Sequence, residues 1–420
     1  MIIPLPALVA YRRDVESLSR SLASAPEVEH ALEQWLAFAL MLESAVAPDP
    51  SSVRDGGADD VEDARQALGR RLFDLAEDRG LAGDVVASMG DAGIASIAAL
   101  TRRVADRAEQ RGALWISYAM LAMLERLGDV MPPLELGRVL AQRARVARKA
   151  DSSDIADALY KRVDALGRTA GLPELTARAA VGFGVLAQVR GNLPLAARHF
   201  GKAARLAARV GDADLLYLAQ HGRMVIAAKR GTFADALSFG WEALATVAGN
   251  SEEEADMLLN LAQIAFDTGH PGPALQGFAA ALARRPGPHL LLPAIGGAAR
   301  AAAALNRTGI VRSCGARIDE FAHEGSFAYP IASALLDLAL ATATTEPTLA
   351  ERYVLRALRL TGEFHFHELE HHLLALQSRL QQRMEPPSGL VPPSRSVGTR
   401  GKEILRQIEQ LDGDLLQAAT

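Results

Sequence analysis

The sequence predicts an all-α fold, an α-solenoid in which antiparallel helix pairs stack one after another. Three observations lead to this prediction. Alanine and leucine, both strong helix formers, are abundant, whereas aromatic residues make up only 5% of the 420 residues. Apolar residues recur at helical spacing in segments that are separated by short turns. The turns themselves recur about every forty residues, which is typical of repeat architectures.

The clearest helix pair lies between residues 255 and 288. Apolar residues at helical spacing occupy positions 258–265, a break follows at Gly269, and a second apolar stripe occupies positions 274–281. Two amphipathic helices joined by a tight turn are what this pattern predicts.

The same frame recurs along the chain. Its turn markers are Asp151, Gly191, Gly231 and Gly269, which lie 40, 40 and 38 residues apart. Fainter copies surround Gly112, the turn at 306–308 and the turn at 344–347, so that recognisable repeats extend over about residues 94–360.

The repeated positions resemble the tetratricopeptide repeat family. That family has a large residue, a large–small pair and a turn glycine in its first helix, and an alanine, an aromatic residue, a second alanine and a proline in its second. The matching residues are Leu258, Leu261, Ala262, Gly269, Ala274, Phe278, Ala281 and Pro286 in one repeat, and Phe183, Gly184, Gly191, Ala196, Phe200 and Ala203 in another. The longer period is similar to the extended-repeat branch of the family. The resemblance implies a scaffold or adaptor without catalytic residues or cofactor, which binds a protein or peptide and regulates or assembles a partner complex.

Composition and spacing divide the chain into five regions. They are an N-terminal helical capping region (1–92), the solenoid (93–361), a C-terminal cap helix (362–384), a disordered linker of Pro, Ser and Gly (385–399) and an amphipathic helix (400–420). The last helix is expected either to reach a partner or to fold back onto the chain.

The resemblance implies that first-helix residues pointing away from the second helix line a partner-binding groove. The candidates are Arg138, Arg145, Arg148, Lys149, Arg178, Gln188, His221, Lys229, Asn260 and Gln263. The amide of Asn260 suits a peptide backbone because it both donates and accepts, although Gly182 and Gly222 replace it in two other repeats. The basic residues 138–149 predict an acidic or C-terminal carboxylate ligand; the alternative is a solvated face paired with acids of a neighbouring repeat.

Charge and cysteine content narrow the class of protein. The net charge of −5 gives no reason to expect a nucleic-acid partner, and the single cysteine, Cys314, cannot form an internal disulfide. No apolar run is long enough to span a bilayer, so the expected protein is soluble, cytoplasmic and not bound to a membrane. The oligomeric state stays open.

Two alternatives compete with the scaffold. Residues 68–100 faintly resemble a helix-turn-helix domain, which would make the protein a ligand-responsive transcription regulator. The motif His367-Glu368-x-x-His371 has the spacing of a zinc metalloprotease. An apolar residue is missing inside that motif and no third ligand follows it, so no metal site is predicted there.

Overall fold

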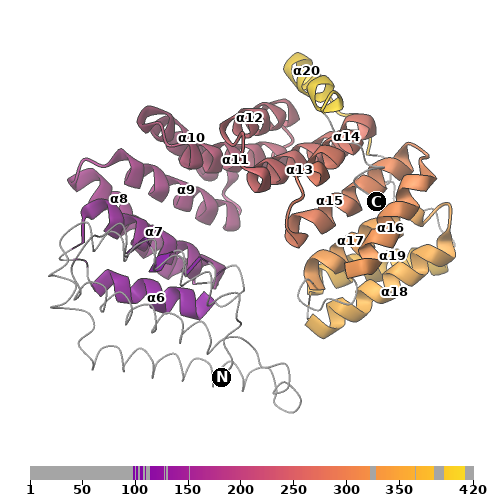
Figure 1. The fold of residues 1–420 in the computed structure, drawn as a ribbon, viewed down its shortest axis with the longest axis horizontal. Coiled ribbons are helices and arrows are strands. Elements are labelled where there is room, and N and C mark those ends of the chain that lie inside the picture. The colour runs from indigo at the N-terminus through magenta and orange to yellow at the C-terminus, as the bar shows by residue number, and fades with distance from the viewer. Residues whose placement is uncertain are drawn as a thin grey trace, which may run out of the picture. The chain divides into compact units, whose positions relative to one another are not determined.

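The computed structural model describes residues 114–126, 128, 131–150, 152–321, 328–364, 366–382 and 392–411, and seven residues before them (98, 99, 101, 102, 105, 106 and 109). Within these residues the regular secondary structure is α-helical and contains no strand (Figure 1). The chain forms two compact units, Met1–Val210 (unit 1) and Gly211–Thr420 (unit 2).

Unit 1 stacks its helices in chain order. They are α6 (Leu114–Arg126), α7 (Pro133–Lys149), α8 (Ser153–Thr169), α9 (Pro173–Val189) and α10 (Leu193–Val210). The pairs α7–α8 and α9–α10 pack internally, and α9 also packs against both helices of the preceding pair. A core of Leu140, Tyr160, Val163 and Leu175 joins the two pairs.

Unit 2 repeats this arrangement. Its helices are α11 (Ala213–Lys229), α12 (Phe233–Thr246), α13 (Ser251–Asp267), α14 (Pro271–Ala283), α15 (Pro288–Ala304), α16 (Thr308–Phe321), α17 (Ala328–Thr342), α18 (Pro347–Phe364), α19 (His367–Gln381) and α20 (Gly398–Glu409). From α11 to α19, each helix packs against the next, and α13, α15 and α17 also contact one another in sequence. Both units are therefore helical-repeat solenoids, as predicted. Helices α7, α9, α11, α13, α15 and α17 are the first helices of their pairs, and α8, α10, α12, α14, α16 and α18 are the second.

The turns are marked by glycines in the left-handed backbone region, which a residue without a Cβ adopts without strain. They are Gly171, Gly191, Gly211, Gly231, Gly249 and Gly269, with φ between 66° and 94°. The predicted turns at Gly191, Gly231 and Gly269 are confirmed, while Asp151 lies outside the described residues. The glycines between pairs, at 171, 211 and 249, form a second series with a similar period, which the predicted frame does not include.

Small residues of one helix receive aromatic rings of its neighbour. Gly184 of α9 and Phe200 of α10 both match the family pattern, and a Cβ built on Gly184 would lie 2.9 Å from the Phe200 ring. A Cβ on Gly182 would lie 2.3 Å from the Tyr160 ring of α8, and one on Gly297 would lie 2.3 Å from Phe278. Adjacent helices therefore approach closely because glycine leaves room for a ring.

The C-terminal segment folds back onto unit 2. Helix α20 packs against α12 and α14, and its Ile404 and Ile408 are fully buried (Figure 1). Residues 392–397, which composition places in the linker, have no regular secondary structure and end at Val397, which is 1% exposed. The helix begins at Gly398 rather than at residue 400, and α18 continues to Phe364, so the cap helix begins at His367 rather than at residue 362.

Candidate partner-binding face

The first-helix face carries most of the residues predicted to bind a partner. It consists of polar side chains that link one first helix to the next or pair within one first helix. In unit 1 these are Arg102, Asp106, Glu109, Glu135, Arg138, Gln142, Arg145, Lys149, Glu174 and Arg178; in unit 2 they are Tyr217, His221, Asp256, Asn260, Gln263, Asp267, Arg300 and Asp337. Several of these links join residues separated by about one repeat.

In unit 1, the basic side chains at the end of α7 are held by acids of the preceding segment. Arg145 Nη2 lies 2.8 Å from Glu109 Oε2, and Lys149 Nζ lies 2.7 Å from Glu109 Oε1. Glu109 is only 3% exposed, whereas Arg145 and Lys149 are 44% and 45% exposed. Burial would lower the pKa of Arg145, but attraction to Glu109 and Asp106 outweighs it and raises that pKa above its ordinary value.

A second set of ion pairs links α7 to α9. Arg138 donates to Glu174 Oε1 from Nε at 3.1 Å and from Nη2 at 3.0 Å, and to Glu135 at 2.7 Å. Arg178 also donates to Glu174, at 3.2 Å. The basic face is therefore paired with acids of neighbouring repeats, which is the arrangement that competes with a carboxylate site.

Arg148 differs from the other basic residues of α7. No ion pair to it occurs among the described residues, and its buried Nε has no hydrogen-bond partner there. It is hydrogen-bonded to the side chain of Tyr160, whose pKa is raised by burial and partly lowered again by the charge of Arg148 and by this hydrogen bond. Arg148 is thus the basic residue of α7 that no described acid neutralises, although Tyr160 uses part of its hydrogen-bonding capacity.

In unit 2, Asp256 connects α11 to α13. Tyr217 donates to Asp256 Oδ2 at 2.7 Å, and His221 Nδ1 lies 3.7 Å from the same oxygen. Asn260 Nδ2 donates to the backbone oxygen of Asp256 at 2.8 Å and to its Oδ1 at 3.0 Å. Burial, followed by the neighbouring Asp256 carboxylate, raises the pKa of Tyr217, so this hydroxyl stays protonated and continues to donate.

These bonds define what Asn260 can still offer. Both hydrogens of its amide have partners within α13, but no described residue donates to its Oδ1. Gln263, three residues later, donates from Nε2 to Asp267 at 2.8 Å, and its Oε1 likewise receives no described donor. Asn260 therefore offers an acceptor alone rather than the donor–acceptor group expected from sequence, whereas Gln263 keeps one N–H donor beside its acceptor.

Further along unit 2, a charged pair joins α15 to α17. Arg300 Nη1 lies 3.3 Å from Asp337 Oδ1, and the Arg300 guanidinium stacks 4.6 Å from the centre of the Phe266 ring. Burial raises the pKa of Asp337 to about 6, although Arg300 opposes this shift. Both side chains are only about one-fifth exposed.

Sequence reasoning missed Tyr217, Arg300 and Asp337. A signal for the last two exists, because Arg300 and Asp337 are lone charges within otherwise apolar helices and lie 37 residues apart. The remaining predicted residues, Gln188 and Lys229, lie near the ends of α9 and α11, with Lys229 exposed.

The missing asparagine at position 182 has a steric explanation. Gly182 lies beneath the Tyr160 ring, where a Cβ does not fit. In the repeat that precedes Asn260, the second-helix aromatic is replaced by Gly240, and the space is filled by Leu261 and Met224. Asn260 is therefore accommodated because the preceding second helix has Gly240 in place of an aromatic residue.

The two alternative motifs lie apart from this face or beyond the described residues. His367 and His371 are exposed on α19, and His367 Nδ1 lies 3.6 Å from Glu370. No group of three side chains suited to a metal ion occurs in the part of the chain that the structure describes. The helix-turn-helix candidate falls almost entirely outside the described residues, as does the N-terminal capping region. None of the described helices combines the length and apolar character needed to cross a membrane.

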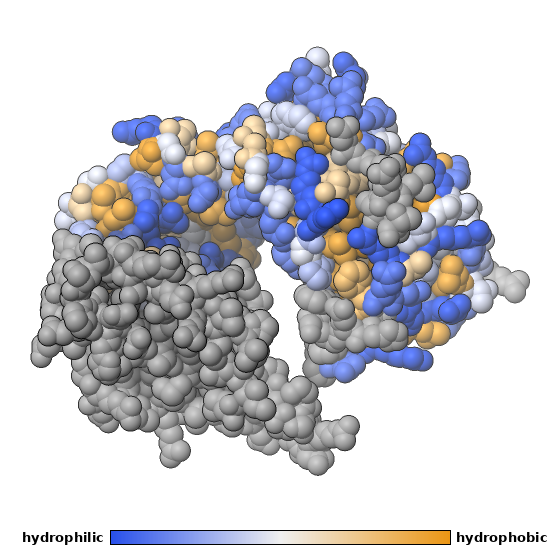
Figure 2. Space-filling model, viewed as in Figure 1, coloured by the Kyte–Doolittle hydropathy of each residue, from blue (hydrophilic) through white to orange (hydrophobic). Residues whose placement is uncertain are grey.

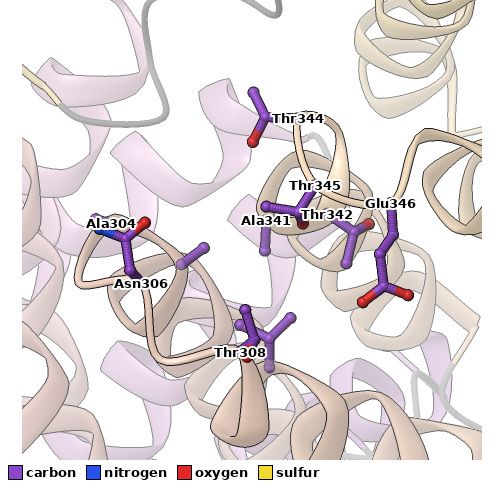
Figure 3. Close-up of a pocket in the computed structure, with 10 residues that line it drawn as sticks. Ala304, Asn306, Thr308, Ala341, Thr342, Thr344, Thr345 and Glu346 are labelled. Atoms are coloured by element: carbon purple, nitrogen blue, oxygen red, sulfur yellow. The ribbon is translucent and has the colours of Figure 1, made fainter.

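A separate pocket of about 350 Å³ lies at the turns α15–α16 and α17–α18 (Figure 3). Asn306 and Thr308 line one side and Thr342 and Glu346 the other. Two of its polar groups already have partners: Thr342 donates to the Leu338 carbonyl at 2.8 Å, and Glu346 pairs with Arg312 at 3.2 Å. The pocket contains no pair of groups suited to acid–base or nucleophilic chemistry among these lining residues.

No protein-family model matches the chain, and no curated protein matches it in sequence. Solved structures do match it. A signal transduction ATPase with numerous domains that carries a tetratricopeptide repeat sensor, from Pyrococcus horikoshii, is 12% identical, with a TM-score of 0.51. That match covers 83% of this chain and 55% of the other, so this chain spans about half of that protein.

Two further structures are similar at lower scores. The quorum sensor NprR from B. thuringiensis is 13% identical over 84% of this chain and 98% of its own, with a TM-score of 0.45. BtubC from P. vanneervenii is 13% identical over 47% of this chain and 81% of its own, with a TM-score of 0.37. At such identities the likeness to the Pyrococcus protein concerns the fold alone, and the fold is a helical repeat.

Proposed function

We propose that the chain is a tetratricopeptide-type scaffold or adaptor that carries out no chemistry and binds a segment of another protein on its first-helix face. The observation that carries the proposal is the combination, on this face, of a fixed polar network with a few groups that the network leaves unused. Such groups are already oriented, so a ligand orders few side chains when it binds.

The unused groups of each unit specify what that unit would bind. In unit 1, Arg148, which precedes Lys149 of this face on α7, would receive a single carboxylate, either a C-terminus or one acidic side chain, because a longer acidic run would compete with Glu109 and Glu174 for the paired bases. In unit 2, Asn260 and Gln263 would accept hydrogen bonds from peptide N–H groups. The single carboxylate proposed for unit 1 is narrower than the acidic segment inferred from the sequence.

The test begins by isolating the partner from the native cell with the full chain as bait and identifying it by mass spectrometry. Its affinity is then measured by calorimetry for the wild type and for Arg148→Glu. We expect the dissociation constant to rise at least about 10-fold, which corresponds to the loss of one charge-assisted contact. Arg148 is preferred over Arg145 because changing Arg145 would remove a partner of the buried Glu109.

The matched control is Arg168→Glu on α8, which makes the same charge change at a side chain that is 70% exposed. Its affinity for the partner should equal that of the wild type. An unchanged affinity in Arg148→Glu, with the control also unchanged, would remove the carboxylate assignment. Asn260→Ala tests the unit 2 contribution in the same assay.

A further inference from the structure

The C-terminal segment 392–411, which we name the clasp, packs on an apolar surface of unit 2 that includes Leu237 of α12 and Gly277 of α14 and that we name the groove. Its helix α20 packs against α12 and α14, which are both second helices. The groove therefore differs from the first-helix face, and its occupant is visible in the structure.

Where α20 contacts the groove, a small residue of α20 faces a large residue of the groove, and a large residue of α20 faces a small residue of the groove. Gly401 of α20 faces Leu237 of α12, because a Cβ on Gly401 would lie 3.3 Å from the Leu237 side chain. Ile408 faces Gly277 of α14, because a Cβ there would lie 3.2 Å from Ile408 Cγ2. Ile404, Leu405 and Ile408 are at most 4% exposed. The groove thus selects a helix with a small residue followed by aliphatic residues three, four and seven positions later.

The non-helical part of the clasp is held at the turn between α13 and α14. The Arg395 backbone N–H donates to the Thr268 carbonyl at 3.0 Å, and the Arg395 guanidinium lies 5.2 Å from the centre of the Phe233 ring. A Cβ on Gly269 would lie 2.8 Å from Ser394 Cα. The other left-handed turn glycines from Gly171 to Gly249 have no atom within 4 Å of such a Cβ.

The charged contacts of the clasp come from Arg395, which lies over the Phe233 ring and attracts the Asp267 carboxylate, and not from α20. The described ion pair of α20, Arg400 with Glu403 at 2.8 Å, is internal to the helix. The remaining charged side chains of α20 are exposed, and Figure 2 shows a largely hydrophilic outer surface there. Apart from the Arg395 contact, the described hydrogen bond to the body is from the Gln276 amide to the Leu411 carbonyl. Docking therefore depends on the apolar layer, which another helix of the same pattern could reproduce.

We propose that the clasp is detachable and that the groove between α12 and α14 is a second interaction surface, which binds an amphipathic helix of a partner protein once the clasp leaves. The partner helix repeats the pattern of Gly401, Ile404, Leu405 and Ile408. While docked, the clasp competes from within the same chain, and a short tether gives it an effective concentration in the millimolar range. A partner helix therefore binds the groove only if it binds more tightly than the docked clasp, or after the clasp has been released.

The test uses the full chain with its clasp weakened by Ile404→Glu and Ile408→Glu. The probe is a fluorescent peptide with the wild-type sequence of residues 392–411, and binding is followed by fluorescence anisotropy. We expect this peptide to bind the weakened chain about 100-fold more tightly than it binds the wild type, since the tethered competitor is gone. A peptide that carries the same two glutamates should not bind.

The matched control chain carries Arg406→Glu and Gln410→Glu, which are exposed positions at α20. It should bind the peptide as weakly as the wild type. Circular dichroism establishes that each variant retains its helices. Equal binding to the weakened and wild-type chains would overturn the proposal, as would dimerisation of the weakened chain, which would make a second copy the occupant of the groove.

Two turn glycines give an independent measurement. Gly269→Ala and Gly231→Ala impose similar backbone strain, because their φ angles are 79° and 74°. Of the two, Gly269 alone lies beneath the clasp. We expect hydrogen exchange in α20 to accelerate at least about 10-fold in Gly269→Ala and to stay unchanged in Gly231→Ala; equal exchange in the two variants would contradict detachment at this turn.

Discussion

The first-helix faces of the two units use different chemistry to link one helix to the next. In unit 1, the links are ion pairs whose basic partner is partly exposed and whose acid is largely buried, such as Arg145 with Glu109 and Arg138 with Glu174. In unit 2, the corresponding links are a phenol–carboxylate hydrogen bond from Tyr217 and the largely buried pair of Arg300 with Asp337. In both units, residues about one repeat apart are linked across consecutive first helices. The chemical character of the linking groups differs between the two units.

This difference has an energetic consequence. An ion pair with a partly exposed partner gains less from its attraction, because water screens the exposed charge. A buried pair costs much more to break than it contributes, because removing one partner leaves the other charge desolvated. In unit 1, Glu109 and Glu174 each have a second basic partner, so losing one base should cost less there than losing Arg300 from Asp337 in unit 2.

The largest expected effect comes from breaking the buried pair. Arg300→Met should lower the free energy of unfolding by about 3 kcal/mol, since Asp337 would lose its counter-ion within an apolar helix. Arg138→Met in unit 1 should cost only about 1 kcal/mol, because Glu174 retains Arg178. Urea denaturation of both variants gives the comparison directly.

The double variant Arg300→Met with Asp337→Leu controls this comparison. Removing both charges should restore stability to within about 1 kcal/mol of the wild type, because no charge is then left buried without a partner. If the double variant is as unstable as Arg300→Met alone, the loss arises from packing around Phe266 and not from the buried charge.

The pH dependence of stability provides a smaller effect. The pKa of Asp337 is raised to about 6 by burial, from an unfolded value near 3.8. An acid whose pKa is raised on folding stabilises the folded state below its unfolded pKa, and this contribution is lost as the pH rises through the folded pKa. Asp337 should therefore contribute on the order of 2 kcal/mol at low pH, lost between about pH 4 and pH 6.

Asp337→Asn isolates that contribution. The difference in unfolding free energy between wild type and variant should change over this pH interval and become constant above about pH 7. Thermal melts in a series of buffers measure it. A difference that is independent of pH would mean that Asp337 titrates alike in the folded and unfolded chain.

The sequence was sufficient for the architecture because the determinants of stacking are local. Gly191, Gly231 and Gly269 mark turns because glycine adopts their left-handed backbone conformation without strain. Gly184 and Phe200 pack against each other because one is small and the other is large. The period follows from these residues without knowledge of distant contacts.

The polar links were harder to predict because they join residues about one repeat apart. The charge of Arg145 is visible in the sequence, but its pairing with Glu109 depends on how α7 packs against the preceding segment. Likewise, the donors of Asn260 are used within its own helix, which turns an expected donor–acceptor group into an acceptor. The place of the clasp depends on a fit of Gly401 to Leu237 and of Ile408 to Gly277 that no single segment of the sequence specifies.

The smallest expected effect is a difference between the first-helix faces of the two units in how salt changes their amide hydrogen exchange. Raising the salt concentration from about 0.05 M to about 1 M shortens the screening length to about 3 Å, which weakens exposed ion pairs far more than buried or neutral hydrogen bonds. Amide hydrogen exchange in α7 and α9 should accelerate about 2- to 5-fold, whereas exchange in α11 and α13 should change by less than about 1.5-fold. Both pairs of helices are compared in the same molecule, so a general effect of salt on stability would change their exchange rates by the same factor. An equal response of the two pairs would show that the ion pairs of unit 1 do not hold its first helices, and that packing of Leu140 and Leu175 alone accounts for the stack.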